Sequence, residues 1–225
     1  LAVHMAATSP DRIWPAASWQ ALLTTVLNEV PSLGIVALGS DNDFSLDKLG
    51  IHSPRTWCLV GKLDLLHTAA ALAQCDLLVG PDSGLLHVAA AMQTPYIGLF
   101  GMADPATRLP LTGNNRALWP DIECRGCLRE LPPQAAPRCR LGHAACMDQV
   151  TEAGVRAEIY ATLATILPDH WQTKAALALG QSLSEPTSST RGNLDGAMSA
   201  YARNDRDEAL RLLLLAIEDE PENPL

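Results

Sequence analysis

The sequence predicts an α/β domain built on a parallel β-sheet. Short continuous apolar runs, typical of strands buried on both faces, alternate along the chain with segments of helical composition. Glycine closes several of these runs, as in "GIVALG" at residues 34–39. A hydrophobic content of 48% and a mean hydropathy of +0.07 suit a soluble globular protein of this kind.

The expected elements alternate between strand and helix. Residues 1–4 form a short apolar run, and residues 19–30 have apolar side chains at the steps of an amphipathic helix. Residues 104–120, with several prolines and asparagines, contain no expected strand. The remaining predicted strands are 34–39, 56–61, 75–80 and 95–101, and the remaining predicted helices are 64–74, 85–92 and 151–167. Such alternation favours a Rossmann-like sheet covered on both faces.

Charge and hydropathy argue against several classes of protein. The formal net charge is −9, so no nucleic-acid partner is expected. No apolar run approaches the roughly 20 residues that cross a membrane, so no transmembrane segment is expected. The first ten residues lack the features of a signal peptide and resemble a strand already in progress. We therefore expect a cytoplasmic fragment of a longer protein.

The end of the chain has a different composition. We expect one domain over residues 1–167, a linker over 168–193 rich in Ser and Thr, and a helical segment over 194–225. The last segment resembles a single tetratricopeptide repeat, which needs neighbouring repeats to bury its apolar face. An unrelated helical hairpin that caps the domain is the alternative.

A polar break lies between the strand at 75–80 and the helix at 85–92. Asp82, Ser83 and Gly84 stand where a helix N-terminus offers backbone N–H groups to an anion such as phosphate. Gly84 allows close approach to the main chain, whereas Asp82 suits the hydroxyls of a sugar. Simple helix capping by Asp82 or Ser83 explains the same residue types. A serine hydrolase is set aside, because the serine is one place late for a G-x-S-x-G elbow.

Residues 75–110 resemble the donor-binding signature of the family 9 glycosyltransferases, the ADP-heptose heptosyltransferases. The start of the chain, "VHMAATSPDRIWP", is similar to the loop that precedes Trp-Pro in the same family. The resemblance covers about residues 1–167. Its matching elements are Asp82, Ser83, Gly84, His87, Ala89-Ala90, Thr94-Pro95, Phe100-Gly101 and Asp104-Pro105.

The resemblance implies the C-terminal, donor-binding half of a GT-B enzyme. Thr8 and Ser9 would bind the diphosphate, and Arg12 would neutralise it, although a solvated surface charge is the alternative for Arg12. Either Asp41 or Asp43 would bind the ribose hydroxyls, unless both are only turn residues. The implied donor-binding set is Thr8, Ser9, Arg12, Asp41, Asp82, Ser83, Gly84 and His87.

The reaction that the resemblance implies is transfer of a sugar, by default heptose from ADP-heptose, with inversion. No cofactor is expected for this chemistry, and the acceptor would be a lipopolysaccharide or a protein. A general base is expected in an N-terminal domain that this chain lacks, so we expect the fragment alone to bind donor but not to catalyse transfer. Peripheral binding at the inner membrane and a protein partner for the repeat are further expectations. The competing hypothesis is a non-enzymatic scaffold that binds partner proteins.

The six cysteines fall into two groups. Cys58 and Cys75 lie in apolar strand contexts and are expected to be buried. The other four, within the loop 124–146, have the spacing C-x2-C-x11-C-x6-C that predicts a structural zinc or iron site, with free thiols and disulfides as alternatives. His143, within the same loop, is an alternative metal ligand in place of one of these cysteines. The predicted metal ligands are Cys124, Cys127, Cys139 and Cys146.

Overall fold

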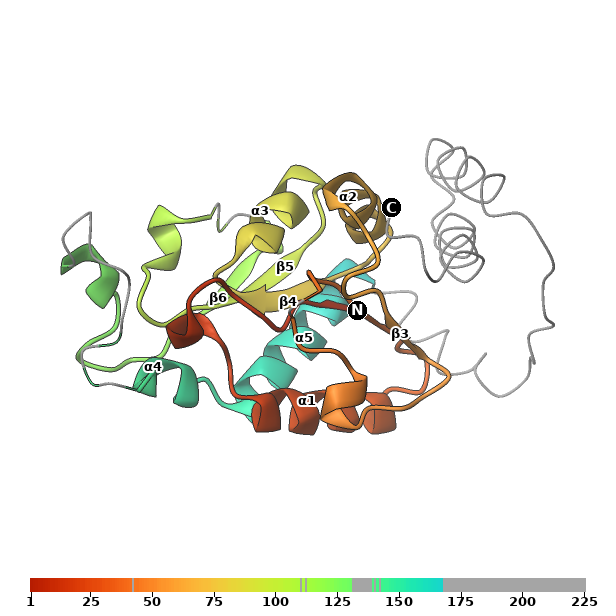
Figure 1. Ribbon diagram of the computed structural model, residues 1–225, viewed down its shortest axis with the longest axis horizontal. Coiled ribbons are helices and arrows are strands. Elements are labelled where there is room, and N and C mark those ends of the chain that lie inside the picture. The colour runs from red at the N-terminus through yellow and green to blue at the C-terminus, as the bar shows by residue number, and fades with distance from the viewer. Residues whose placement is uncertain are drawn as a thin grey trace.

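The computed structural model describes residues 1–41, 43–109, 111, 113–130, 139, 141 and 143–167 (Figure 1). The predicted linker at 168–193 and the predicted repeat at 194–225 lie outside these residues. The described part is an α/β domain, as the sequence predicts.

Six parallel strands form one sheet with the order β3-β2-β1-β4-β5-β6. In register, Ala2 of β1 pairs with Val36 on one side and with Leu78 on the other. The chain therefore builds outward from β1 in one direction and then from β4 in the other, which is the order of a Rossmann sheet. The strands are β1 (Ala2–Val3), β2 (Ile35–Ala37), β3 (Thr56–Cys58), β4 (Leu78–Pro81), β5 (Tyr96–Leu99) and β6 (Arg116–Leu118).

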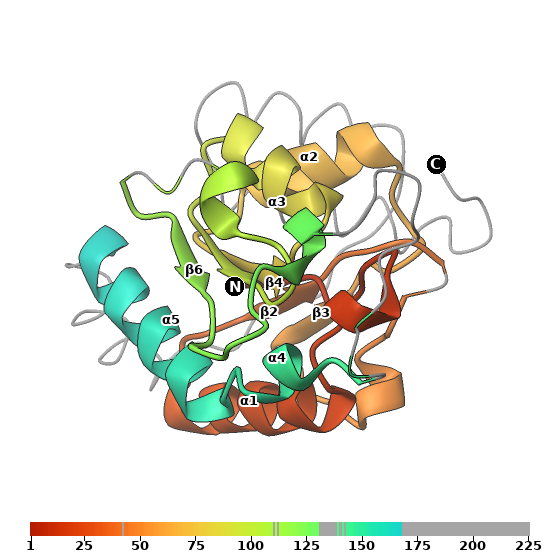
Figure 2. The ribbon, with the colours of Figure 1, turned by 90° about the vertical axis from the view of Figure 1, so that its left-hand side faces the viewer.

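Helices cover both faces of the sheet: α2 and α3 lie on one face, and α1, α4 and α5 on the other (Figures 1 and 2). None of the described helices is long and apolar enough to cross a membrane. The α-helices are α1 (Ala16–Glu29), α2 (Leu65–Ala73), α3 (Gly84–Ala91), α4 (Ala145–Asp148) and α5 (Glu152–Ile166). Short 3-10 helices are η1 (Pro10–Arg12), η2 (Asp47–Leu49), η3 (Pro105–Thr107) and η4 (Cys127–Glu130).

The strands are apolar on both faces because each face has its own core. Successive side chains of a strand point to opposite faces, so Val3 packs with α1 and α5 while Ala2 packs with α2 and α3. The same alternation separates Val79 from Leu78 in β4. Continuous apolar runs are the consequence, and this is why the sequence pattern identifies these strands.

Strand β6 was not predicted from the sequence. Its three residues lie in the segment for which no strand was expected, and all three are only half-buried. Arg116 pairs with Ile97 of β5, and the N–H of Phe100 donates to the carbonyl of Leu118 at 2.9 Å. Tertiary pairing with β5 therefore forms this strand, because three half-buried residues produce no apolar run.

The C-terminus of α1 is held by a side chain from the start of β3. The guanidinium of Arg55 donates to the carbonyls of Val30 at 3.0 Å, Leu33 at 2.8 Å and Leu27 at 2.7 Å. The last carbonyls of a helix have no partner within the helix, and a cation is favourable at that end of the dipole. Arg55 therefore satisfies the end of α1 and ties it to the edge strand β3.

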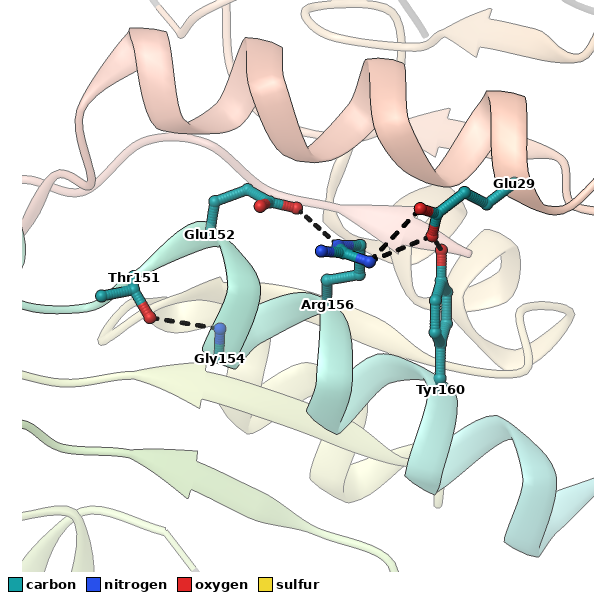
Figure 3. Close-up of polar contacts among 6 residues, drawn as sticks. All are labelled: Glu29, Thr151, Glu152, Gly154, Arg156 and Tyr160. Atoms are coloured by element: carbon teal, nitrogen blue, oxygen red, sulfur yellow. Dashed lines mark hydrogen bonds and ion pairs between the residues drawn. The ribbon is translucent and has the colours of Figure 1, made fainter.

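A polar cluster joins α1 to α5 at the surface (Figure 3). Arg156 contacts Glu152 at 2.9 Å and Glu29 of α1 at 3.1 Å, and the hydroxyl of Tyr160 donates to Glu29 at 2.7 Å. Burial, together with the neighbouring Glu29, raises the pKa of Tyr160 to about 12. Thr151 caps the start of α5 by accepting from the N–H of Gly154. The ion pairs are solvent-exposed, so their contribution to stability is small.

We predict that Arg55→Met destabilises the chain, because the apolar stem is retained while three hydrogen bonds are lost, to carbonyls in the last turn of α1, at its C-cap and in the segment that follows. Hydrogen bonds to charged groups contribute enough for an expected loss of about 2 kcal/mol. Urea denaturation measures the free energy of unfolding. The matched control is Arg156→Met on the exposed cluster, which should cost clearly less; an equal or larger loss for Arg156→Met contradicts this account.

Candidate functional site

A cavity of about 760 Å³ opens at the carboxyl ends of β1, β2 and β4. This edge lies at the point where the strand order reverses between β1 and β4, the position at which open α/β sheets bind their ligands. The cavity has an apolar part, formed by side chains such as Phe44, Leu63 and Leu65, and a polar part. The polar lining consists of His4, Thr8, Ser40, Asp43, Asp64, Thr68 and Ser83.

His4 contacts two other residues of the polar part. Its Nδ1 is 2.9 Å from the Oγ of Ser83, and its Nε2 is 3.4 Å from the Oδ2 of Asp43. The residue is 7% exposed, and this burial lowers the pKa of His4 below its usual value, although the nearby Asp43 carboxylate acts in the opposite direction. Gly80 of β4 allows His4 to lie close to this strand, because a Cβ on Gly80 would be only 3.3 Å from the Cβ of His4.

Sequence reasoning missed His4. In the sequence it is the last residue of a short apolar run, but in the structure it directly follows β1 and therefore stands at the binding edge of the sheet. A polar, titratable residue at the carboxyl end of a predicted central strand is the signal that identifies it.

Two helix N-termini border the cavity, and they differ in their capping. At α2, the Oδ1 of Asp64 accepts from the N–H of His67 at 2.8 Å, which lowers the pKa of Asp64. At α3, Ser83 occupies the N-cap position, but its side chain makes no capping hydrogen bond. The hydroxyl of Ser83 contacts His4 instead. A Cβ on Gly84, the first residue of α3, would meet nothing within 4 Å, so the backbone there borders open space.

Arg12 and Asp82 form an ion pair beside the cavity. The Nη1 of Arg12 is 3.4 Å from the Oδ2 of Asp82 and donates to the carbonyl of Asp82 at 3.4 Å. Asp82 is only 5% exposed, and its Oδ2 has no hydrogen-bond partner among the described residues. The pair places a cation from the β1–α1 loop directly behind the N-terminus of α3.

The predicted donor residues fall into three groups in the structure. Thr8, Ser83 and Gly84 line the cavity, together with Asp43, the alternative to Asp41. Ser9, Arg12 and Asp82 lie next to it: Ser9 is buried, and the other two are paired. Asp41 and His87 are exposed and lie outside the lining; the Oδ1 of Asp41 faces Gly61. The placement therefore favours Asp43 over Asp41 as a ligand-facing carboxylate.

The predicted cysteine cluster lines a second cavity, of about 610 Å³. Cys124, Cys127 and Cys139 contribute to its wall. Burial, together with the nearby Cys139 and Cys124, raises the pKa of Cys146 to about 11. Among the described residues, no three His, Cys, Asp or Glu side chains are close enough together to hold a metal ion, and no disulfide is formed.

The cysteine loop also contacts the first loop of the sheet. The N–H of Cys139 donates to the Oδ2 of Asp11 at 2.8 Å, and its thiol donates to the carbonyl of His143 at 2.7 Å. Since Asp11 precedes Arg12, the cysteine loop touches the segment that holds the Arg12–Asp82 pair. His143 contributes a backbone oxygen to this contact, and its Nδ1 lies 3.0 Å from the carbonyl of Leu141.

Together, the strand order and the edge cavity define a Rossmann-like domain of the type found in GT-B enzymes. The sequence model of the family described as Glycosyltransferase family 9 (heptosyltransferase) matches residues 1–135, which is more than half of the chain. The chain therefore belongs to glycosyltransferase family 9.

Curated relatives agree with this assignment. The chain is 28% identical over 113 residues to lipopolysaccharide heptosyltransferase 2 of Salmonella typhimurium, covering 48% of this chain and 32% of the relative. It is 30% identical over 115 residues to lipopolysaccharide heptosyltransferase 2 of Escherichia coli, with the same coverage. The alignments thus cover about a third of the length of these relatives.

Solved structures share the fold. The ADP-heptose lps heptosyltransferase II of E. coli matches with a TM-score of 0.56 and 22% identity, over 73% of this chain and 46% of that one. The iron-containing dodecameric glycosyltransferase TibC of enterotoxigenic E. coli matches with a TM-score of 0.57 and 16% identity, over 73% and 45% of the two chains. At these identities the likeness concerns the fold alone.

We predict that His4 makes the stability of the chain fall at low pH. In the unfolded chain His4 binds a proton near its usual pKa of about 6.5, but in the folded chain only at a lower pH. As pH falls through this window, the unfolded state binds more protons and stability decreases. Urea denaturation at pH 7.5, 6.5 and 5.5 should show a smaller decrease for His4→Gln than for the unsubstituted chain.

The control for this series is His52→Gln, since the side chain of His52 is 72% exposed. It should follow the unsubstituted chain at every pH. An identical pH dependence for His4→Gln and the unsubstituted chain would show that burial of His4 does not act on stability.

Proposed function

We propose that this chain is the donor-binding half of a glycosyltransferase that transfers a sugar, heptose by family default, from its ADP derivative. The observation that supports this most directly is the N-terminus of α3, which borders the cavity without a side-chain cap. Free N–H groups and the helix dipole at such a position favour a phosphate. Family membership adds the expectation that the phosphate belongs to a nucleotide sugar.

A phosphate in the cavity could bind at the N-terminus of α2 or at the N-terminus of α3. The carboxylate of Asp64 already accepts from the N–H of His67 in the first turn of α2, and its negative charge repels phosphate. At α3, no carboxylate lies on the first N–H groups, and Gly84 leaves space for close approach. We therefore place the diphosphate at Ser83 and Gly84, with Thr8 from the facing loop as a further hydrogen-bond donor.

The remainder of the nucleotide sugar fits the other parts of the site. Asp43 lines the cavity beside β2, which suits ribose hydroxyls better than the exposed Asp41. The apolar wall around Phe44 and Leu65 suits a nucleobase. Asp82, whose Oδ2 is ion-paired with Arg12 but has no hydrogen-bond partner within the described residues, is assigned to sugar hydroxyls.

Three further predicted residues have supporting or open roles in this assignment. Arg12 partly neutralises Asp82 and lends positive charge to the diphosphate end of the site. Ser9, which is buried at the start of η1, positions the loop that contains Thr8. His87 is exposed on α3 and outside the cavity lining, so the role implied for it by the family resemblance depends on a sugar that extends beyond the cavity.

The proposed reaction is inverting transfer of the sugar to an acceptor hydroxyl, on lipopolysaccharide or a protein, and no cofactor is assigned to it. A general base must remove the acceptor proton. The solved relatives extend well beyond the matched region, so we assign the base to the part of such enzymes that this chain does not match. Action in the cytoplasm, peripherally at the inner membrane, is part of the proposal.

The competing hypothesis is a scaffold that retains the fold without binding a nucleotide. The family match favours the transferase, and so does the open N-terminus of α3. The resemblance of residues 194–225 to a tetratricopeptide repeat, joined through a linker at 168–193, is the basis for proposing a protein partner in addition to the donor. These residues lie outside the described part.

We predict that ADP and ADP-heptose bind the chain in calorimetric titrations, and that UDP-sugars bind more weakly. Gly84→Ala should weaken ADP binding by about tenfold or more, because its Cβ projects into the space assigned to phosphate. The same change should leave Tm unchanged or slightly higher, since a Cβ meets no atom there and alanine reduces the entropy of the unfolded chain.

Asp82→Ala separates the two parts of the donor, because it should weaken ADP-heptose binding more than ADP binding. A preference for a UDP-sugar would retain the transferase class and refute the family default. A folded chain that binds none of these nucleotides would favour the scaffold.

We also propose that Cys124, Cys127, Cys139 and Cys146 hold a structural zinc or iron ion. Support comes from their spacing, from the cavity that three of them line, and from the proximity of Cys139 and Cys124 to Cys146, whose pKa they help to raise. A set of four thiols suits these two metals, and a bound cation would reverse the unfavourable ionisation of Cys146. A solved relative with the same fold is described as iron-containing.

We predict close to one equivalent of zinc or iron in the purified chain by elemental analysis. Cys124→Ser should remove most of this metal, whereas Cys75→Ser, a substitution outside the loop, should retain it. The unsubstituted chain should be purified without chelators. A metal content below about a tenth of an equivalent would then show that the four cysteines are free thiols.

A further inference from the structure

We infer that His4 is a positioning residue of the proposed donor site, which takes up a proton when a diphosphate binds and thereby turns the hydroxyl of Ser83 toward the phosphate. The inference rests on the proposed function, because it assigns a role to the ligand of that site. It concerns a residue to which the family resemblance assigns no role and which the proposed ligand set does not include. Three features of the geometry support it.

The first feature is the tautomer of His4. A carboxylate can only accept hydrogen bonds, so the contact between Nε2 and Asp43 places the proton of the neutral ring on Nε2. Nδ1 is then an acceptor, and the Ser83 hydroxyl 2.9 Å away must donate to it. In the free chain, therefore, the only proton of the Ser83 hydroxyl points at His4 and not at the cavity.

The second feature is the consequence of protonation. When His4 gains a proton from solvent, Nδ1 becomes a donor and bonds to a lone pair of the Ser83 oxygen. The hydroxyl of Ser83 keeps its proton but no longer donates it to His4, so it can turn and donate to a phosphate oxygen at the N-terminus of α3. One proton thus adds a positive charge beside the diphosphate and supplies a hydrogen bond to it.

The third feature is the arrangement of charge around the ring. Asp43, after β2, faces Nε2 and also accepts from the N–H of Ser40 at 2.7 Å. From the β4–α3 side, Asp82 is the nearest carboxylate in sequence to Ser83, and it is paired with Arg12 from the β1–α1 loop. Asp64, at the start of α2, lines the same cavity and is engaged by His67. A bound diphosphate is the additional negative charge that raises the proton affinity of His4.

The test uses ADP-ribose and the complete chain. The terminal phosphate of ADP itself titrates at about pH 6, as phosphate monoesters do, whereas each phosphate of ADP-ribose carries one ester and one anhydride bond and has no second ionisation. Calorimetry in two buffers of different ionisation enthalpy, from pH 5.5 to 8.0, measures both Kd and the protons taken up on binding. We expect fractional proton uptake, and affinity that rises as pH falls, by at most tenfold per pH unit for one linked proton.

His4→Gln should bind ADP-ribose with a Kd that varies less than about twofold over this range and with no proton uptake. Ser83→Ala should weaken binding most at low pH, where the released hydroxyl would donate to phosphate. Asp43→Asn should shift the pH dependence to lower pH, because the carboxylate that favours protonated His4 is lost. His52→Gln, an exposed histidine outside the cavity, is the control and should behave as the unsubstituted chain.

A second measurement does not depend on folding of the variants. Nitrogen NMR of the unsubstituted chain at pH 8 should show His4 with its proton on Nε2, and ADP-ribose at pH 6.5 should convert it to the doubly protonated ring. Binding that is independent of pH, or proton uptake that persists in His4→Gln, overturns the role of His4 and leaves the donor site intact. No binding at any pH removes the proposed function together with this inference.

Discussion

The pairing of β1 with both β2 and β4 is the constraint on which the site depends. The chain adds β2 on one side of β1 and later adds β4 on the other side. The loops after β1 and β4 therefore lead to opposite faces of the sheet. The space between them is the cavity, and the residues that directly follow the two strands meet in it. His4 and Ser83 are 79 positions apart in sequence and 2.9 Å apart in the structure for this reason.

The contact between His4 and Ser83 connects the sheet to the chemistry of the helix end. A serine at an N-cap position normally satisfies an N–H group of its own helix, but here its hydroxyl is held by the histidine. The N-terminus of α3 is left open as a result, while that of α2 is closed by Asp64. The difference between two helix ends that border one cavity is what distinguishes an anion site from an ordinary capped helix.

Much of the architecture could be predicted from the sequence, because buried parallel strands leave a direct record in apolar runs. The predicted strands at 34–39 and 95–101 contain β2 and β5, and the predicted strand at 75–80 covers β4 except for its last residue, Pro81. The capping hypothesis for Ser83 could not be decided, since capping and ligand binding require the same residue types. Only the position of His4 distinguishes them, and that position depends on the pairing of β1 with β4.

Other features depend on tertiary structure in the same way. Strand β6 exists because β5 offers it hydrogen bonds, and its three residues form no apolar run. The choice between Asp41 and Asp43 depends on a single turn after β2, which directs one side chain toward Gly61 and the other toward His4. The pairing of Arg12 with Asp82 joins two loops that the sequence separates by 70 positions.

The central claim is that a diphosphate binds at the open N-terminus of α3. The most direct measurement is a titration of the nitrogen-labelled chain with inorganic pyrophosphate, which has the diphosphate but no nucleobase to shift the amides near Leu65, followed through the backbone amide resonances. The account predicts that the largest shifts occur at the N–H groups of Gly84 and Leu85, with much smaller shifts at Leu65 and Leu66 of α2. Saturable shifts centred on α2 or away from the cavity, with those of α3 unchanged, would contradict it.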